Sequence, residues 1–215
     1  MDILFKKNDI SNDAALIVGV YENLLLTKTA KKIDALLNGK LSKALKDNFF
    51  NGKEGQTQEL IPHDIPARRL ICLGLGKKEK TSELAACRIG AYAAKALLTS
   101  GETAVEFAVD DLPAAAVGFG AKIASYRFTK HKTIFKAPVT LKEFYILTEK
   151  PQVAQNQYEP YFAVAKGIHT ARDLVNEPAN VINPIAFAKR AEELQKYGLT
   201  TEVYDEKQLK AKGLN

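Results

Sequence analysis

The chain has 215 residues and a formal net charge of +6; 46% of its residues are hydrophobic and 26% are charged. This is the composition of an ordinary globular protein that can bury a core. The apolar run in Met1–Lys7 is too short for a signal peptide, and no other run approaches the roughly 18 residues of a membrane span, so we expect a soluble, cytoplasmic protein without a membrane partner. The lysines are scattered along the chain, which is typical of faces exposed to solvent. The alternative interpretation is a basic surface that binds nucleic acid weakly.

The first predicted elements are a strand and two short helices. The continuous apolar run Ala14–Val20 has the length of a strand that is buried on both faces of a sheet. Lys31–Leu37 and Ser42–Phe49 are predicted to be helical. Gly39 is predicted to be a left-handed stop after the first helix, and Ser42 the cap of the second.

A second buried strand is predicted at Arg69–Leu73, and Gly74–Gly76 ends it. A long helix is predicted over Glu83–Leu98, with Thr81 and Ser82 as possible caps. The negative charge of Glu83 is favourable at the positive N-terminal end of a helix, and Gly101 follows the last turn. Apolar residues then alternate with other side chains in Val105–Val109, which predicts a strand.

An alanine-rich helix is expected over Pro113–Tyr126, followed by a strand over Phe144–Thr148. Strands that alternate with helices indicate an α/β fold: a mixed, largely parallel sheet flanked by helices. The polar segment Pro151–Tyr158 is the predicted linker, and a helix should follow over Tyr161–Asn176.

The last part of the chain has the pattern of an incomplete second α/β unit. Pro178 ends the preceding helix, Asn183 is a predicted N-cap, and Pro184 takes the first helical position. A strand at Thr201–Tyr204 and a short helix at Glu206–Lys212 are expected to follow. The predicted buried stripe of the first of these helices consists of Ile185, Ala188, Ala191 and Leu194.

The sequence contains three histidines that could be metal ligands, His63, His131 and His169. Only His169 has a carboxylate at helical spacing, Asp173, four residues further on. Two donors leave a zinc site incomplete. We therefore interpret His169 as a residue that forms a surface or interface hydrogen bond, and metal binding by this pair is the less favoured alternative.

Gly74-Leu75-Gly76 lies between a predicted strand and a predicted helix, where dinucleotides and phosphates often bind. The third glycine of the dinucleotide motif is absent, since Glu79 stands in its place, and the chain has no P-loop motif. We interpret the glycines as the means of a tight turn. An anion site at the helix start is the alternative, with charge from Lys77, Lys78 and Lys80.

The remaining candidates also have structural explanations. Asp110 and Asp111 end a strand and suit a turn better than a pair of catalytic carboxylates. Cys72 and Cys87 match neither a disulfide framework nor a zinc site, and we expect both to behave as small buried hydrophobic residues. The sequence contains no serine-hydrolase, zinc-peptidase or cysteine-nucleophile signature. No catalytic, metal-binding or cofactor-binding residue is therefore assigned to this chain.

Three segments resemble one family of enzymes. The run Ala171–Asn180 (Ala-Arg-Asp-Leu-Val-Asn-Glu-Pro-Ala-Asn) is closely similar to the hinge of the leucyl, or cytosol, aminopeptidases, the M17 metallopeptidase family. Arg69–Gly76 and Tyr126–Lys132 also resemble the N-terminal domain of that family. The resemblance implies a macro-like N-terminal α/β domain at 1–150, a linker and hinge helix at 151–180, and a truncated start of the catalytic domain at 181–215.

The resemblance also implies a function for the intact enzyme. Members of the family remove N-terminal residues such as leucine from peptides, as cytoplasmic homohexamers that use two divalent metals, zinc or manganese. Their metal ligands lie downstream of the hinge, in a segment that this sequence does not match. We therefore expect the missing catalytic domain to be the partner of this chain, and the chain alone to be inactive. We also expect it to expose apolar helical faces within 185–194.

A binding module is the alternative function. Some relatives of the macro-like fold bind ADP-ribose, and some N-terminal halves of the family help to contact DNA. A nucleotide-binding module should bind its ligand near Gly74–Gly76, whereas nucleic-acid binding should weaken as salt is added. Both ideas are analogies between folds rather than inferences from a site.

Overall fold

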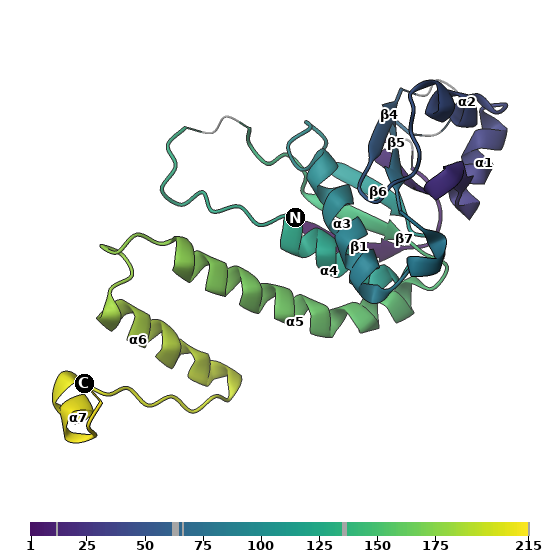
Figure 1. Ribbon diagram of the computed structural model, residues 1–215. Helices are drawn as coiled ribbons and strands as arrows, with labels where there is room; N and C mark the ends of the chain where they lie inside the picture. Colours follow the sequence, from purple (N-terminus) through teal and green to yellow (C-terminus); the bar gives the residue numbers. More distant parts are fainter. Residues whose placement is uncertain (12, 62–64, 66, 135–136, 215) are drawn as a thin grey trace. The chain divides into compact units, whose positions relative to one another are not determined.

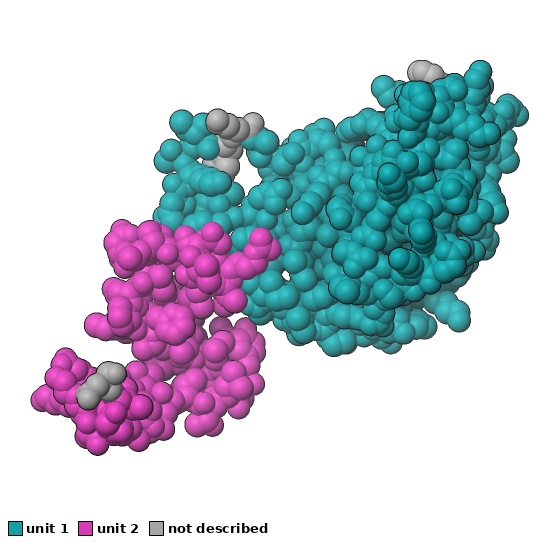
Figure 2. All heavy atoms as spheres, in the orientation of Figure 1, with its two compact units in different colours: residues 1–169 teal, residues 170–215 magenta. Residues whose placement is uncertain are grey.

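A computed structural model describes residues 1–11, 13–61, 65, 67–134 and 137–214. The chain divides into two compact units, Met1–His169 and Thr170–Asn215, which Figure 2 draws in different colours. Each unit is described by itself. Among the described residues, no helix is both long enough and apolar enough to cross a membrane.

The first unit is built on one mixed sheet (Figure 1), with the strand order β1-β7-β6-β2-β5-β4, and β3 pairs with β2 outside that path. Every neighbouring pair from β1 to β5 in that order is parallel. The strand β4 pairs antiparallel with β5, and β3 pairs antiparallel with β2. The predicted mixed, largely parallel sheet is therefore confirmed. The strands are β1 Asp2–Lys6, β2 Ala15–Tyr21, β3 Leu25–Leu26, β4 Thr57–Leu60, β5 Arg69–Gly74, β6 Ala104–Ala108 and β7 Glu143–Leu147.

The sheet lies between two layers of helices. Ile17 and Phe107 belong to a cluster with buried residues of α3 and α4, whereas Leu16 and Val18 belong to a second cluster with buried residues of α1 and α2. Neighbouring residues of β2 thus face opposite layers, and all seven residues of this strand are buried, as its continuous apolar run predicts. The helices of this unit are α1 Lys28–Leu36, α2 Lys40–Asp47, α3 Glu83–Leu97 and α4 Ala114–Ala124.

Two glycines let α3 and α4 approach until their backbones touch. A Cβ atom at Gly90 of α3 would lie 1.9 Å from the Val117 carbonyl oxygen, and one at Gly120 of α4 would lie 1.7 Å from the Cys87 carbonyl oxygen. Real Cβ atoms do not come this close to backbone. The two helices therefore cover one face of the sheet as a single tightly packed layer.

A chain of ion pairs lies where β5 and β6 begin and the antiparallel strand β4 ends. Arg69, at the start of β5, donates to both carboxylate oxygens of Glu59 on β4 at 2.6 and 2.8 Å, and also to the buried carboxylate of Glu102 at 3.2 Å. Arg68 donates to the second oxygen of Glu102 at 2.8 Å. Burial of Glu102 is tolerated because both of its oxygens accept charged hydrogen bonds.

Several helix boundaries differ from the predicted ones. Gly39 does adopt a left-handed conformation, with φ of +79°, but Ser42 is not the cap of α2, since that helix already begins at Lys40. The Ser42 backbone N–H donates to the Asp34 carboxylate at 2.9 Å, and its hydroxyl donates to the other oxygen, so the two helices are tied through a side chain. Ser82 does cap α3, accepting from the Ala85 N–H at 3.2 Å.

The segment predicted as a linker is helical. The helix α5 spans Pro151–Asn176, so it begins ten residues before the predicted start at Tyr161. Proline is favoured in the first turn of a helix, and the buried Tyr158 packs against the Phe5 ring at 5.4 Å between centroids. Contact with β1 thus stabilises a turn whose polar sequence alone favours a loop.

In the second unit, the helical predictions hold and the strand prediction fails. Asn183 caps α6 (Pro184–Glu192), and Asp205 with Gln208 forms a capping box at α7 (Glu206–Ala211). Thr201–Tyr204 forms no strand. A strand needs a neighbour with which to share its hydrogen bonds, and the described part of this unit contains none.

The predicted stripe, which begins on α6 and ends in the turn after it, is not buried here: Ile185 is 72% exposed and Leu194 is 38% exposed, while neighbouring Phe187 is 55% exposed. The expectation that this segment exposes apolar faces is confirmed. The pattern that predicted burial is present, but nothing in the described residues covers it.

The glycine contact leads to a stability prediction. Gly120→Ala places a methyl group against the Cys87 carbonyl, so it should lower the free energy of unfolding by about 3 kcal/mol or more. Gly167→Ala is the matched control, because it lies in α5 with open space around it and should raise stability by about 0.5–1 kcal/mol. Urea denaturation followed by circular dichroism measures both, and equal effects would contradict the role of the contact.

The ion pairs lead to a prediction about pH. Hydrogen bonds from Arg69 lower the pKa of Glu59 below its usual range. Such a carboxyl contributes stability that is fully present above its unfolded pKa of about 4.3 and is lost as the pH falls through the folded pKa. Stability should therefore fall on acidification below about pH 5, and Glu59→Gln should make that fall shallower.

Denaturation midpoints at several pH values between neutrality and acid test this expectation. Glu79→Gln is the control, since exposed Glu79 forms no ion pair within the part of the chain that the structure describes. The same pH slope in both variants would show that the Glu59–Arg69 pair does not stabilise the fold.

Candidate functional site

The segment that resembles the aminopeptidase hinge forms the end of α5 and the turn that follows it. Asn176 closes the helix by donating from its side chain to the Arg172 carbonyl at 2.7 Å. After Pro178, two backbone N–H groups, of Val181 and Ile182, donate back to the Pro178 carbonyl. The Asn183 side chain then accepts from the Ala186 N–H at 3.0 Å and starts α6. The motif thus encodes a helix end, a turn and a helix start.

The two described histidines, His131 and His169, do not form part of a metal site. The His169 ring packs against Tyr126 at 5.3 Å between centroids, and His131 packs against Phe128 at 5.7 Å, while His63 lies outside the described residues. His169 and Asp173 lie one turn apart on α5, as expected. No group of three or more histidine, cysteine or acidic residues that could hold a metal occurs in the described ranges.

The backbone N–H groups of the glycine turn after β5 donate to carbonyls of the same chain. The N–H groups of Gly74, Leu75 and Gly76 donate to the carbonyls of Gln56, Val20 and Gly52 at 2.7, 2.9 and 2.9 Å. A Cβ at Gly74 would lie 2.0 Å from the Lys53 carbonyl oxygen, and Gly76 has φ of +74°. A phosphate-binding loop needs outward-facing N–H groups, so the geometry agrees with a tight turn and gives the anion site no support.

Asp110 acts as a helix cap supplied by another element. Its carboxylate accepts from the Thr29 backbone N–H at 3.0 Å and from the Thr29 hydroxyl at 2.7 Å, in the first turn of α1. A negative charge at a helix N-terminus is favourable. Asp110 has φ of +47°, and the Leu112 N–H donates to the Val109 carbonyl at 2.8 Å, so the predicted turn role is confirmed. Asp111 is exposed beside it.

Neither cysteine is a reactive thiol. Cys72 is fully buried, and desolvation raises its pKa to about 12. Cys87 is half-buried on α3, and desolvation raises its pKa as well. The nucleophile of cysteine chemistry is the thiolate. Both thiols therefore stay protonated near neutral pH, as expected of packed hydrophobic residues.

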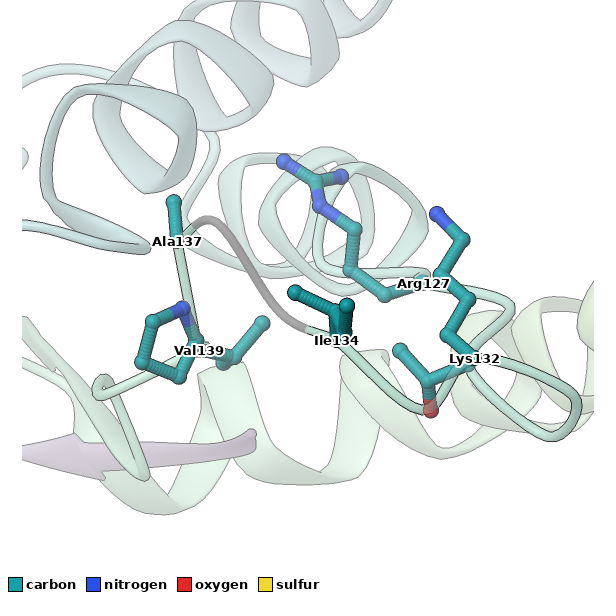
Figure 3. A pocket seen from close by; sticks show the side chains of 7 residues that line it. Arg127, Lys132, Ile134, Ala137 and Val139 are labelled. Carbon is teal, nitrogen blue, oxygen red and sulfur yellow. The ribbon is translucent and has the colours of Figure 1, made fainter.

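A hollow of about 770 Å³ lies in the loop between α4 and β7. In Figure 3, Arg127 and Lys132 lie on one side of this hollow, Ala137 and Val139 on the other, and Ile134 between them. Thr129 and Pro138 complete its lining. The hollow combines two cationic side chains with an aliphatic surface.

The sequence analysis did not predict this hollow. One signal was available: the sequence contains no aspartate or glutamate between Asp111 and Glu143. Neither Arg127 nor Lys132 forms an ion pair within the described chain. Their positive charge is therefore available to an anionic group.

The profiles of known protein families decide the relationship. The profile described as the cytosol aminopeptidase family, N-terminal domain, matches residues 17–134, and the profile of that family's catalytic domain matches residues 169–215. The chain belongs to the cytosol aminopeptidase family.

Curated relatives of this cytosol aminopeptidase family chain agree. A "Probable cytosol aminopeptidase" of Caulobacter vibrioides is 34% identical over 206 residues, which cover 94% of this chain and 42% of the relative. A protein of the same name from Sinorhizobium fredii is 35% identical over 188 residues, covering 82% of this chain and 38% of the relative. The chain thus spans about two fifths of the length of the relatives it matches.

Solved structures support the same fold. A mutant of tomato leucine aminopeptidase superposes with a TM-score of 0.81 and 25% identity, covering 98% of this chain and 46% of that one. The bottromycin maturation enzyme BotP in complex with Mn gives a TM-score of 0.68 at 21% identity, covering 94% of this chain and 40% of that one. The BotP match speaks for the fold alone. The α/β fold expected from the sequence is the fold of these structures.

The Asp110 cap of this family member gives a third prediction. Asp110→Ala removes both hydrogen bonds to Thr29 and should lower the free energy of unfolding by about 1–2 kcal/mol. Asp111→Ala, one residue away and exposed, should change it by less than about 0.5 kcal/mol. Thermal and urea unfolding of the two variants makes the comparison. A harmless Asp110→Ala substitution would show that α1 does not depend on this carboxylate.

Proposed function

We propose that this chain serves as the N-terminal region of a metal-dependent aminopeptidase that releases N-terminal residues such as leucine from peptides. The observation that carries the proposal is the pair of family matches in one chain, N-terminal domain and then catalytic domain, in the order 17–134 and 169–215. The superposition on tomato leucine aminopeptidase over nearly the whole chain supports it. The activity belongs, in this proposal, to a longer protein or complex that includes this chain.

The two divalent metals of that enzyme, zinc or manganese, would be held by other residues. Tetrahedral or bridged metal sites need at least three or four protein ligands that converge. In the described residues, His169 and Asp173 are two donors on one helix, and no third donor joins them. The residues present do not fit the metals, so we propose that the chain alone hydrolyses no peptide.

The role left to the chain is that of a scaffold. The first unit has a continuous core on both faces of its sheet, and α5 connects that core to the family's catalytic-domain sequence. Exposed apolar residues on α6, such as Ile185 and Phe187, fit a surface that the remainder of a catalytic domain would cover. We extend the proposal to a cytoplasmic homohexamer for the complete enzyme, by analogy with the family.

The alternative of a macro-like nucleotide-binding module has weaker support. Its expected site, Gly74–Gly76, has backbone N–H groups that donate to the protein's own carbonyls. Adjacent Lys77 and Lys78 are exposed to solvent. A nucleotide would need those N–H groups or an equivalent set of donors, so the scaffold role remains the proposed function.

A chimera tests the proposed function. Residues 1–215 are joined to the part of the Caulobacter vibrioides relative that follows its matched region, and hydrolysis of leucine p-nitroanilide is measured with added Mn²⁺ or Zn²⁺. The chimera should hydrolyse the substrate in a metal-dependent way. The 215-residue chain should not exceed the metal-only blank, because it offers two donors where a catalytic site needs more.

Two outcomes would contradict this. Turnover by the chain alone that disappears in His169→Ala or Asp173→Ala would reveal a site within it. A chimera with the circular dichroism of a folded protein but no metal-dependent turnover would contradict the scaffold role. Sedimentation of the active chimera would then test whether six copies assemble.

A further inference from the structure

The tripeptide Asn-Gly-Lys occurs twice in the chain, at 38–40 and at 51–53, and the proposed function uses neither copy. When glycine follows asparagine, its backbone nitrogen can attack the asparagine side-chain amide with little obstruction, because glycine has no side chain of its own. The two residues that follow each asparagine are the same, so the local chemistry of the two copies is matched. A difference in their reactivity must therefore come from the folded structure.

The first copy lies in the turn between α1 and α2 (Figure 1), where its reacting nitrogen is hydrogen-bonded. The Gly39 backbone N–H donates to the Asp34 carbonyl at 2.9 Å. The Asn38 N–H donates to the Ala35 carbonyl at 3.1 Å, and Asn38 has φ of +51°. These bonds close the last turn of α1. Attack by the Gly39 nitrogen requires this helix end to open first, so the fold protects Asn38.

The second copy lies in the loop between α2 and β4 and holds its reacting groups differently. The Asn51 side-chain oxygen accepts from the Lys53 N–H at 3.3 Å, and the Asn51 N–H donates to the Gln56 side chain at 3.0 Å. The first of these bonds is an Asx turn, which brings the side-chain carbonyl toward the Gly52 nitrogen. Within the described part of the chain, neither the N–H nor the carbonyl of the peptide group between Asn51 and Gly52 forms a hydrogen bond.

We propose that Asn51 is a site of spontaneous deamidation, in which the Gly52 nitrogen attacks the Asn51 side chain. A bond forms from this nitrogen to Cγ, and the bond from Cγ to Nδ2 breaks. Ammonia leaves, and solvent transfers to it the proton that the Gly52 nitrogen gives up. Water then opens the cyclic imide at either carbonyl, which produces aspartate or isoaspartate. The Lys53 N–H stabilises the negative charge that develops on Oδ1 during the attack, as donors of an oxyanion hole do.

The modification changes the packing at the ends of two neighbouring strands. A Cβ on Gly52 would lie 2.1 Å from the carbonyl oxygen of Tyr21, the last residue of β2. The Gly52 carbonyl accepts from the Gly76 N–H at 2.9 Å, just after β5. Isoaspartate adds a methylene to the main chain and so displaces Gly52 from both contacts. The isoaspartate form should therefore unfold at a lower urea concentration than the unmodified chain.

The test incubates the folded 215-residue chain at mildly alkaline pH in water labelled with heavy oxygen. Mass spectrometry of proteolytic peptides then follows label uptake and isoaspartate at each copy of Asn-Gly-Lys. Asn51 should convert at least fivefold faster than Asn38 in the folded chain, because only Asn38 requires a helix end to open. In concentrated urea the two rates should agree within about twofold, since local sequence alone then acts.

Asn51→Gln and Asn38→Gln are the matched variants, because both asparagines are exposed and glutamine would have to close a larger ring. Asn51→Gln should remove most of the isoaspartate that the folded chain forms, whereas Asn38→Gln should leave it unchanged. Equal rates at the two positions in the folded chain, or a faster rate at Asn38, would overturn the proposal. A rate at Asn51 that is tenfold lower in the folded chain than in urea would also overturn it, because the loop would then be protective.

Discussion

The close contact between α3 and α4 is the constraint on which one layer of the fold depends. Because Gly90 and Gly120 have no side chains, the two helices meet backbone to backbone and present one continuous surface of small apolar residues to the sheet. The large buried rings of Phe107 and Phe144, which meet edge to face, occupy the space beneath that surface. Larger residues at the two glycines would separate the helices and open the core between them.

The charged groups at the strand ends mostly form hydrogen bonds that connect the elements of the first unit. Asp110 caps α1 from the end of β6, and Glu102 joins the starts of β5 and β6 through Arg68 and Arg69. A carboxylate that accepts such hydrogen bonds is oriented by them and has little capacity left for a ligand. This is the physical reason why Asp110, which was weighed as a catalytic residue in the sequence, is structural here. The loop around Arg127 differs, because Arg127 and Lys132 form no ion pair within the described residues.

The two units contrast in how they bury apolar surface. The first unit encloses its own core on both faces of the sheet, while α6 in the second exposes Ile185 and Phe187. The catalytic-domain profile of the family matches residues 169–215, which include this helix. The capping groups of α6 and α7 hold the helices in place locally.

The sequence by itself determined the α/β class and the buried strand β2, because these depend on local periodicity. It also determined the caps at Ser82 and Asn183, which depend on single residues, and the family relationship, which depends on a contiguous motif. Only the tertiary structure decided that polar 151–158 is helical, that 201–204 is unpaired, and that a cationic hollow forms between α4 and β7. The first two depend on residues distant in sequence, because a helix turn is stabilised by packing on another strand and a strand needs a neighbour. The hollow depends on the course of a single loop, which no local pattern of residues predicts.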